Sequence, residues 1–239
     1  MKYKMLFLFF FFLTGKLLHA QAQFSGWFGN FSSFKLSNKL SIHFDGQLRS
    51  TDDIEHISTL LLRTGLNLNL RKNMIGTAGY AYIRNRREIG NVSGYAPEHR
   101  IWQQFIVSHP VINTTLSHRF RLEQRFIAKS EVDNNELKNE GNVYANRFRY
   151  FFRTMVPLGD KLQEKTPFIA LQNEVFVNFG DKSGVNGEFF DQNRAYLAFG
   201  YRFSQRFDAE IGYMNQYING RNNSFTNNHI LQLATYLRL

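Results

Sequence analysis

Residues 116–126 read LSHRFRLEQRF, and apolar and polar side chains alternate along this stretch. The even positions carry Leu116, Phe120, Leu122 and Phe126. The odd positions carry Arg119, Arg121, Glu123 and Arg125. Successive side chains of a β-strand point to opposite faces, so the stretch predicts a strand with one apolar face and one charged face. Residues 146–153, NRFRYFFR, repeat this pattern.

The same period of two extends through most of the chain. It is clear in LSIHFDGQL (40–48), LLLRTGLNLNLRK (60–72) and ILQLATYLRL (230–239). We predict strands at residues 24–36, 39–51, 58–71, 74–86, 98–109, 114–129, 143–156, 167–180, 193–204, 207–219 and 228–239. After residue 22 no apolar run approaches the roughly 20 residues that a membrane helix needs. The sequence therefore predicts an all-β fold.

The first 22 residues have a different composition. MKYKMLFLFFFFLTGKLLHAQA begins with two lysines, continues with an apolar run and ends in a small-residue site, as is typical of a secretory signal peptide. We assign residues 1–22 to a signal peptide. Export argues against a nucleic-acid partner, although the chain has a net charge of +10 and residues 23–239 keep +7 of it. The absence of cysteine excludes a disulfide framework and a lipid anchor on cysteine.

The connections between the predicted strands are of two kinds. Short turns such as SNK (37–39) and SQR (204–206) alternate with longer polar stretches such as NRREIGNVSGYAP (85–97) and KSEVDNNELKNEGN (129–142). Short turns at one rim and longer loops at the other are typical of an up-and-down antiparallel transmembrane β-barrel. Bacterial barrels of this kind have an even number of strands, so we expect about ten, with twelve as the alternative.

This strand number fixes the expected domain organisation. Residues 39–239 form the barrel domain, with the short turns on the periplasmic side. Residues 23–38 are then an N-terminal segment that serves as a plug, a flap or an extra strand.

Alternation alone does not separate a membrane barrel from a soluble periplasmic barrel that binds a small apolar ligand. Two observations favour the membrane: the apolar face continues through nearly every strand, and aromatic residues fall near strand ends, where lipid headgroups lie. These aromatic residues are Tyr95, Tyr144, Tyr201, Tyr213 and Tyr217. We expect a monomer in the bacterial outer membrane, surrounded by its lipid and delivered by periplasmic chaperones and the barrel-assembly machinery.

A membrane barrel points its polar side chains inward, and charges buried in a narrow interior must be paired. We predict a charge ladder that lines the lumen and consists of Arg119, Arg121, Glu123, Arg125, Arg147, Arg149, Arg153, Glu174, Arg194 and Glu210. Most other acidic residues lie in or beside the longer loops, so arginine outnumbers carboxylate inside. A water-filled path would therefore prefer anions. The alternative is a largely filled lumen in which the ladder has a structural or binding role.

Catalytic and ligand-binding motifs are weak in this sequence. Ser–His pairs occur at 108–109 and 117–118, and His118 lies on the apolar face of its predicted strand. Adjacent residues of a strand point to opposite faces, so neither pair forms a ready nucleophile and base. The histidines lack the spacing of metal ligands. We predict no catalytic residue, metal site or cofactor, and a lipid-modifying outer-membrane enzyme remains an alternative.

Several segments together suggest a family. They include HRFRLEQRF (118–126), NRFRYFFRTMVPL (146–158), FIALQNEVFVNF (168–179) and FDQNRAYLAFGYRFS (190–204). In this order the segments resemble a family of exported barrel proteins of Gram-negative bacteria that is catalogued as a domain of unknown function. The resemblance covers residues 27–239. It implies an outer-membrane-type barrel and brings no activity, substrate or catalytic residue with it.

Overall fold

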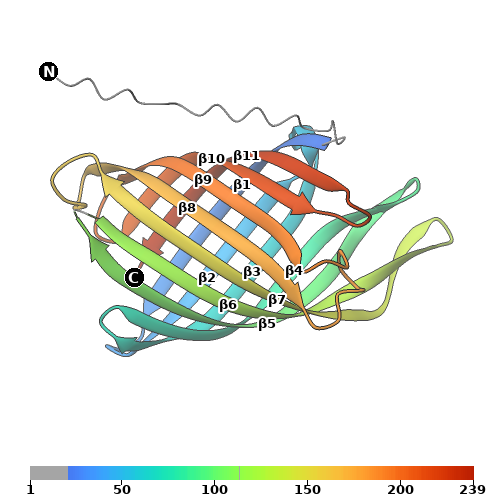
Figure 1. The fold of residues 1–239 in the computed structure, drawn as a ribbon, viewed down its shortest axis with the longest axis horizontal. Helices are drawn as coiled ribbons and strands as arrows, with labels where there is room; N and C mark the ends of the chain where they lie inside the picture. Colours follow the sequence, from blue (N-terminus) through green and yellow to red (C-terminus); the bar gives the residue numbers. More distant parts are fainter. Residues whose placement is uncertain (1–20, 113) are drawn as a thin grey trace, which may run out of the picture.

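The computed structural model describes residues 21–112 and 114–239, which form a closed β-barrel of strongly tilted strands (Figure 1). Residues 1–20, where the signal peptide is expected, lie outside the described part of the chain. The predicted all-β, up-and-down barrel is confirmed. Among the described residues, no helix is long and apolar enough to cross a membrane.

Each predicted strand corresponds to one strand of the structure. The strands are β1 (Gln21–Lys35), β2 (Leu40–Ser50), β3 (Ile57–Arg71), β4 (Met74–Ile89), β5 (Val92–Val111), β6 (Thr114–Asp133), β7 (Glu136–Pro157), β8 (Thr166–Phe179), β9 (Phe190–Arg202), β10 (Phe207–Asn219) and β11 (Phe225–Arg238). A short 3-10 helix, η1 (Asp52–Ile54), lies between β2 and β3.

The barrel has eleven strands, a number between the expected ten and its alternative of twelve. Neighbouring strands pair antiparallel, except that β1 and β11 pair in parallel and close the barrel. Gln21 is paired with Thr226, and Ser33 with Arg238. The segment that could have been a plug, a flap or a strand is thus hydrogen-bonded on both sides as β1. An odd number of alternating strands can close only if the first and last run in the same direction.

The two rims of the barrel carry different connections. We call the rim near Leu239 the C-terminal rim, and the opposite rim, where two β-hairpins project, the hairpin rim (Figure 1). Residues 85–97 and 129–142, expected as loops, instead extend the strand pairs β4–β5 and β6–β7 to two-residue turns. Asn134 and Asn135 have φ values of 50° and 63°, the left-handed conformation that such hairpin turns require. Polar residues are frequent on both faces of these hairpins, so the apolar–polar alternation that predicts a strand is weak there.

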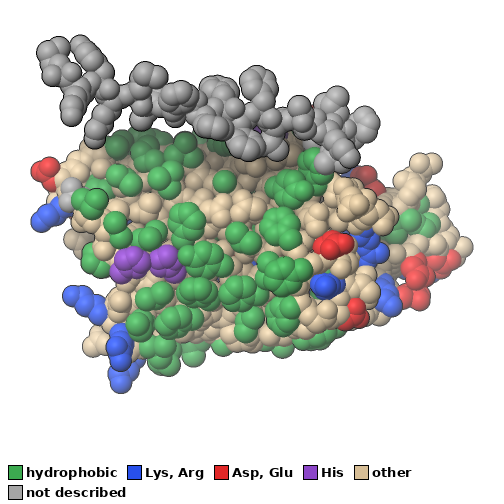
Figure 2. Space-filling view, in the orientation of Figure 1, with side chains coloured by type: hydrophobic (Ala, Val, Ile, Leu, Met, Phe, Trp, Pro, Cys, Tyr) green, Lys and Arg blue, Asp and Glu red, His purple; other side chains and the backbone are tan. Residues whose placement is uncertain are grey.

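The outside of the barrel is apolar. Exposed large hydrophobic side chains cover the wall between the rims, whereas many of the charged side chains in view gather near the two ends (Figure 2). The middle of β9 and β3 gives examples, since Leu197 is 52% exposed and Leu66 is 50% exposed. In the same barrel Arg121, Glu123 and Asp45 are each 1% exposed. The polarity is therefore the inverse of that of a water-soluble globular protein.

Glycines allow large side chains to lie flat inside the barrel. A Cβ atom placed on Gly79 would come within 2.6 Å of the Trp102 ring, and one on Gly65 within 2.7 Å. Trp102 is fully buried and packs in a cluster with Leu61 and Ile83. The missing side chains on β3 and β4 thus make room for the indole ring of β5.

Candidate functional site

Charged side chains fill much of the barrel interior. Between the rims, the described arginines that face inward are Arg49, Arg63, Arg100, Arg119, Arg121, Arg125, Arg147, Arg149, Arg153 and Arg194. The described carboxylates that do so are Asp45, Glu98, Glu123, Glu174, Asp191 and Glu210. All ten residues expected in the ladder lie among them. Arginine outnumbers carboxylate in this set, so the interior carries excess positive charge.

The centre of the interior is a continuous network of ion pairs. Arg149 of β7 joins two carboxylates, because its Nη1 lies 2.6 Å from Glu123 Oε1 and its Nη2 lies 2.7 Å from Glu174 Oε1. Arg147 Nη2 lies 2.7 Å from Glu123 Oε2, and Arg119 Nη2 lies 2.7 Å from Glu174 Oε1. Alternate residues of β6 and β7 point to the same side of the sheet, which brings these groups together. The shared carboxylates offset part of the cost of burying the charges.

Two further ion-pair groups lie nearer to the hairpin rim and along β2. Glu98 Oε1 accepts hydrogen bonds from Arg100 Nε at 2.7 Å and from Arg125 Nε at 2.6 Å. Arg63 Nη1 lies 3.3 Å from Asp45 Oδ2. The sequence-based ladder omitted Glu98 and Arg100. Their parity within β5 was the available signal, since both alternate with outward-facing residues.

Arg121 is the most deeply buried of the expected ladder arginines. Its Nε and Nη2 donate to Gln104 Oε1 at 3.0 and 2.6 Å, and its guanidinium lies 4.7 Å from the centroid of the Trp102 ring. The nearest carboxylate, Glu123, is 4.0 Å away. Arg121 therefore depends on an amide and an aromatic face more than on an ion pair.

Arg49 of β2 and Arg194 of β9 have a different environment. Within residues 21–112 and 114–239, neither guanidinium has a carboxylate within 4.0 Å. Each donates one hydrogen bond to a glutamine, at 2.8 Å for Gln47 and 3.2 Å for Gln192. Both guanidiniums lie over the Trp27 ring, at 4.1 and 5.0 Å from its centroid. The buried Nε atom of each arginine has no hydrogen-bond partner among the described residues.

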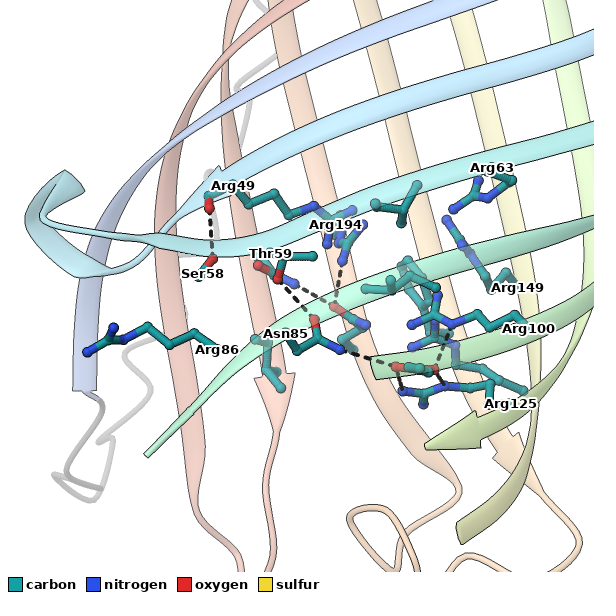
Figure 3. A pocket seen from close by; sticks show the side chains of 18 of the residues that line it. Arg49, Ser58, Thr59, Arg63, Asn85, Arg86, Arg100, Arg125, Arg149 and Arg194 are labelled. Atoms are coloured by element: carbon teal, nitrogen blue, oxygen red, sulfur yellow. Dashed lines mark hydrogen bonds and ion pairs between the residues drawn. The ribbon is translucent and has the colours of Figure 1, made fainter. Parts of the chain in front are cut away.

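These two arginines lie between two cavities. The first, on the hairpin side, has a volume of about 340 Å³ (Figure 3). The second, in the middle of the barrel, has a volume of about 280 Å³. The residues that border both cavities are Arg49, Arg63, Arg149 and Arg194. We call these four residues the arginine layer. In Figure 3 the Arg49 and Arg194 side chains extend into the same part of the interior.

A third cavity continues the series toward the C-terminal rim. Its volume is about 450 Å³, and Thr114, Met155 and Arg202 are among its lining residues. Arg153 borders both this cavity and the middle one. Three cavities thus follow one another from the hairpin rim to the C-terminal rim, and arginine lies between each and the next.

Comparison with known proteins places the chain in a family. A family model described as protein of unknown function (DUF2490) matches residues 24–227. The chain belongs to this family. The expected membership in a family of unknown function is thereby confirmed. This DUF2490 chain is similar to a solved structure of the NanC porin in a rhombohedral crystal form. The sequence identity is 11% and the TM-score is 0.47. The match covers 84% of this chain and 92% of the porin chain. No curated protein matches the chain.

The histidine and serine candidates of this DUF2490 protein are separated by the barrel wall. His118 faces outward, and its Nδ1 lies 2.8 Å from the Tyr150 hydroxyl. Ser117 faces the opposite way, and its hydroxyl lies 2.9 Å from that of Ser108. In the described part of the chain, no three histidine or acidic side chains gather as a metal site. Among residues 21–112 and 114–239, no histidine is hydrogen-bonded to Ser108 or Ser117 as a base.

Proposed function

We propose that this protein is a monomeric outer-membrane barrel with a narrow, anion-preferring path through its interior. The observation that carries the proposal is the arginine layer, which borders the hairpin-side cavity and the middle cavity at once. A solute that crosses the barrel through these cavities has to pass the four guanidiniums.

The outer surface supports the membrane part of the proposal. Exposed leucine, isoleucine and phenylalanine side chains surround the barrel between its rims. A continuous apolar surface of this kind is unfavourable in water and favourable against lipid. The barrel has no free sheet edge, since β1 is bonded to β11, so it does not need a second copy to satisfy its backbone.

The interior supports the anion preference. Arginine remains protonated at neutral pH, and the interior holds more arginines than carboxylates. A charged group in a narrow space surrounded by protein and lipid acts more strongly on ions than it would in bulk water. Cations would therefore be repelled at the arginine layer, and small anions would be attracted.

The geometry favours this proposal over the alternatives. A soluble barrel for an apolar ligand would turn its apolar face inward, whereas here the large hydrophobic side chains of the wall face outward and the arginines face inward. A lipid-modifying enzyme needs a catalytic group at the lipid face, and His118 there contacts only an outward tyrosine among the described hydrogen-bond partners. A closed barrel with a purely structural role differs from the proposal in one measurable property, its conductance.

Planar-bilayer recording of the purified protein tests the proposal. Under a KCl gradient we expect single-channel current steps. The potential at which the net current is zero should lie closer to the equilibrium potential of chloride than to that of potassium. The double variant Arg49→Glu/Arg194→Glu should shift this potential toward the equilibrium potential of potassium. Arg206→Glu is the control, because Arg206 is exposed at the C-terminal rim and its substitution makes the same charge change per arginine away from the arginine layer. Absence of conductance, or cation selectivity of the unmodified protein, would reject the path.

Localisation is tested separately. We expect the protein to sediment with outer membranes and to remain there after an alkaline carbonate wash. Recovery in the soluble periplasmic fraction would reject the membrane proposal.

A further inference from the structure

We propose that Arg49 and Arg194 form a saturable binding site for a small hydrophilic oxyanion, with inorganic phosphate as the simplest case. The inference deepens the proposed function and rests on it, because the site lies on the proposed path. It concerns equilibrium binding, however, so it can be measured without a current.

The two arginines are the least compensated charges of the interior. The other inward arginines between the rims each have a carboxylate within 4.0 Å. Arg49 and Arg194 have glutamines instead, and both approach the same Trp27 ring. Two like charges on one indole ring repel each other, and a buried charge without a counter-ion is costly. An anion between them would remove both costs.

Hydrogen-bond donors are available for such an anion. The Nε atom of each arginine is buried and has no partner among the described residues. Leaving a buried donor unsatisfied is unfavourable, so buried donors are usually paired. The guanidinium presents its donors in a planar fork that matches the oxygen atoms of phosphate or carboxylate. The bonds to Gln47 and Gln192 use Nη2 of each guanidinium, and Nη1 makes no hydrogen bond to the described residues, so it is the donor left for a ligand.

The surrounding aromatic rings argue for a hydrophilic ligand. Trp27 is covered by the two site arginines, and Phe151 has Arg119 over its ring at 4.2 Å. Phe31 and Tyr236 stack on each other with their centroids 5.1 Å apart. These faces are already occupied, so they do not offer a platform on which a ligand ring could stack. The polar groups at the site itself are the guanidiniums of Arg49 and Arg194 and the amides of Gln47 and Gln192, which suit a small oxyanion.

The carboxylates near the two cavities do not compete for the site. Glu98 borders the hairpin-side cavity and is paired with two arginines of its own. Glu174 borders the middle cavity and is likewise paired with two arginines. Both therefore make their ion pairs with arginines other than Arg49 and Arg194.

Fluorescence of Trp27 provides a direct test. The chain has two tryptophans, so Trp102→Phe leaves Trp27 as the only reporter, directly against the site. The detergent-solubilised full chain is titrated with phosphate. Separate titrations use acetate, as a representative carboxylate, and chloride, all at matched ionic strength. We expect a saturable change with phosphate, a weaker one with acetate and none with chloride. A response that follows ionic strength alone would overturn the inference.

Substitutions locate the site. Arg49→Gln and Arg194→Gln should each weaken phosphate binding by at least about tenfold, because each removes a charged hydrogen-bond donor. Arg206→Gln should leave binding unchanged. Calorimetric titration of the chain with both tryptophans retained repeats the measurement if Trp102→Phe does not fold. Equal phosphate affinity in all three arginine variants would overturn the assignment.

Binding and conductance separate the two proposals. Saturable phosphate binding without any current would keep the site and reject the path. An anion-selective current without saturable binding would keep the path and reject the site.

Discussion

Arg153 of β7 reaches across the barrel interior to Glu210 of β10, and its Nη2 lies 2.6 Å from Glu210 Oε2. Along the wall, β8 and β9 separate these two strands. The contact therefore ties together parts of the barrel that share no backbone hydrogen bond. Tyr236 donates a hydrogen bond to the same carboxylate at 2.7 Å, so Glu210 is the shared acceptor of this crossing.

Breaking this crossing should destabilise the barrel. Glu210→Gln leaves the guanidinium of Arg153 without its counter-charge, and loss of one partner of a buried pair costs about 3–5 kcal/mol. Arg153→Met/Glu210→Gln should cost less than the sum of the two single changes. Urea unfolding in phospholipid vesicles measures all three variants. Additive losses would show that the two residues are not coupled.

The space above Gly79 should be closed to larger residues. Gly79→Val places a Cβ atom 2.2 Å from the Thr64 carbonyl oxygen and 2.6 Å from the Trp102 ring, and overpacking of this kind costs about 1–3 kcal/mol. Gly76→Val is the control on the same strand, because a Cβ at Gly76 meets only Leu70, at an ordinary contact distance of 3.5 Å. Thermal unfolding followed by tryptophan fluorescence should separate the two variants. Equal melting temperatures would contradict the described packing.

The outer surface should be sensitive to charge only in its middle. Leu197→Arg puts a guanidinium halfway along β9, where a lipid-facing charge costs about 2–4 kcal/mol. Leu36→Arg, in the turn at the C-terminal rim, should cost little. Folding yield into lipid vesicles measures the difference. If the barrel were surrounded by water, both exposed substitutions would be near neutral.

The parallel pairing of β1 with β11 should be detectable by cross-linking. Asn30 and Thr235 are register partners, and their side chains are joined by a 2.9 Å hydrogen bond. The chain has no cysteine, so Asn30→Cys/Thr235→Cys introduces a single thiol pair. We expect a disulfide after mild oxidation. The pair Asn30→Cys/Thr226→Cys, which is nine residues out of register, should remain reduced; its oxidation at an equal rate would reject this seam.

The fold could be predicted from the sequence wherever apolar and polar residues alternate along a strand. Strands such as β6 have one face on the outside of the barrel and one face toward its interior. Apolar and polar residues therefore alternate along their sequence. The projecting halves of β4 and β7 lack this contrast, and Arg86 and Glu140 therefore suggested loops. The strand number depended on β1, whose pairing with β11 joins residues about 200 positions apart. Such a contact leaves no local signal.

The same distinction applies to the interior. Parity alone predicted that Arg119, Glu123 and Arg149 face the same side. Which arginine meets which carboxylate depends on strand tilt and register around the barrel, as with Arg153 and Glu210. Arg49 was missed for this reason: its importance comes from Trp27, on the neighbouring strand, and from the absence of a nearby acid among the described residues.

Because the number of strands is odd, the first strand begins at one rim of the barrel and the last strand ends at the other. β1 begins at the hairpin rim, whereas β11 runs toward the rim at which Leu239 lies. An epitope inserted between Gln23 and Phe24 and another appended after Leu239 would therefore be displayed on opposite sides of the membrane. Antibody access to each in intact cells would read out the orientation of the whole barrel from a single doubly labelled chain.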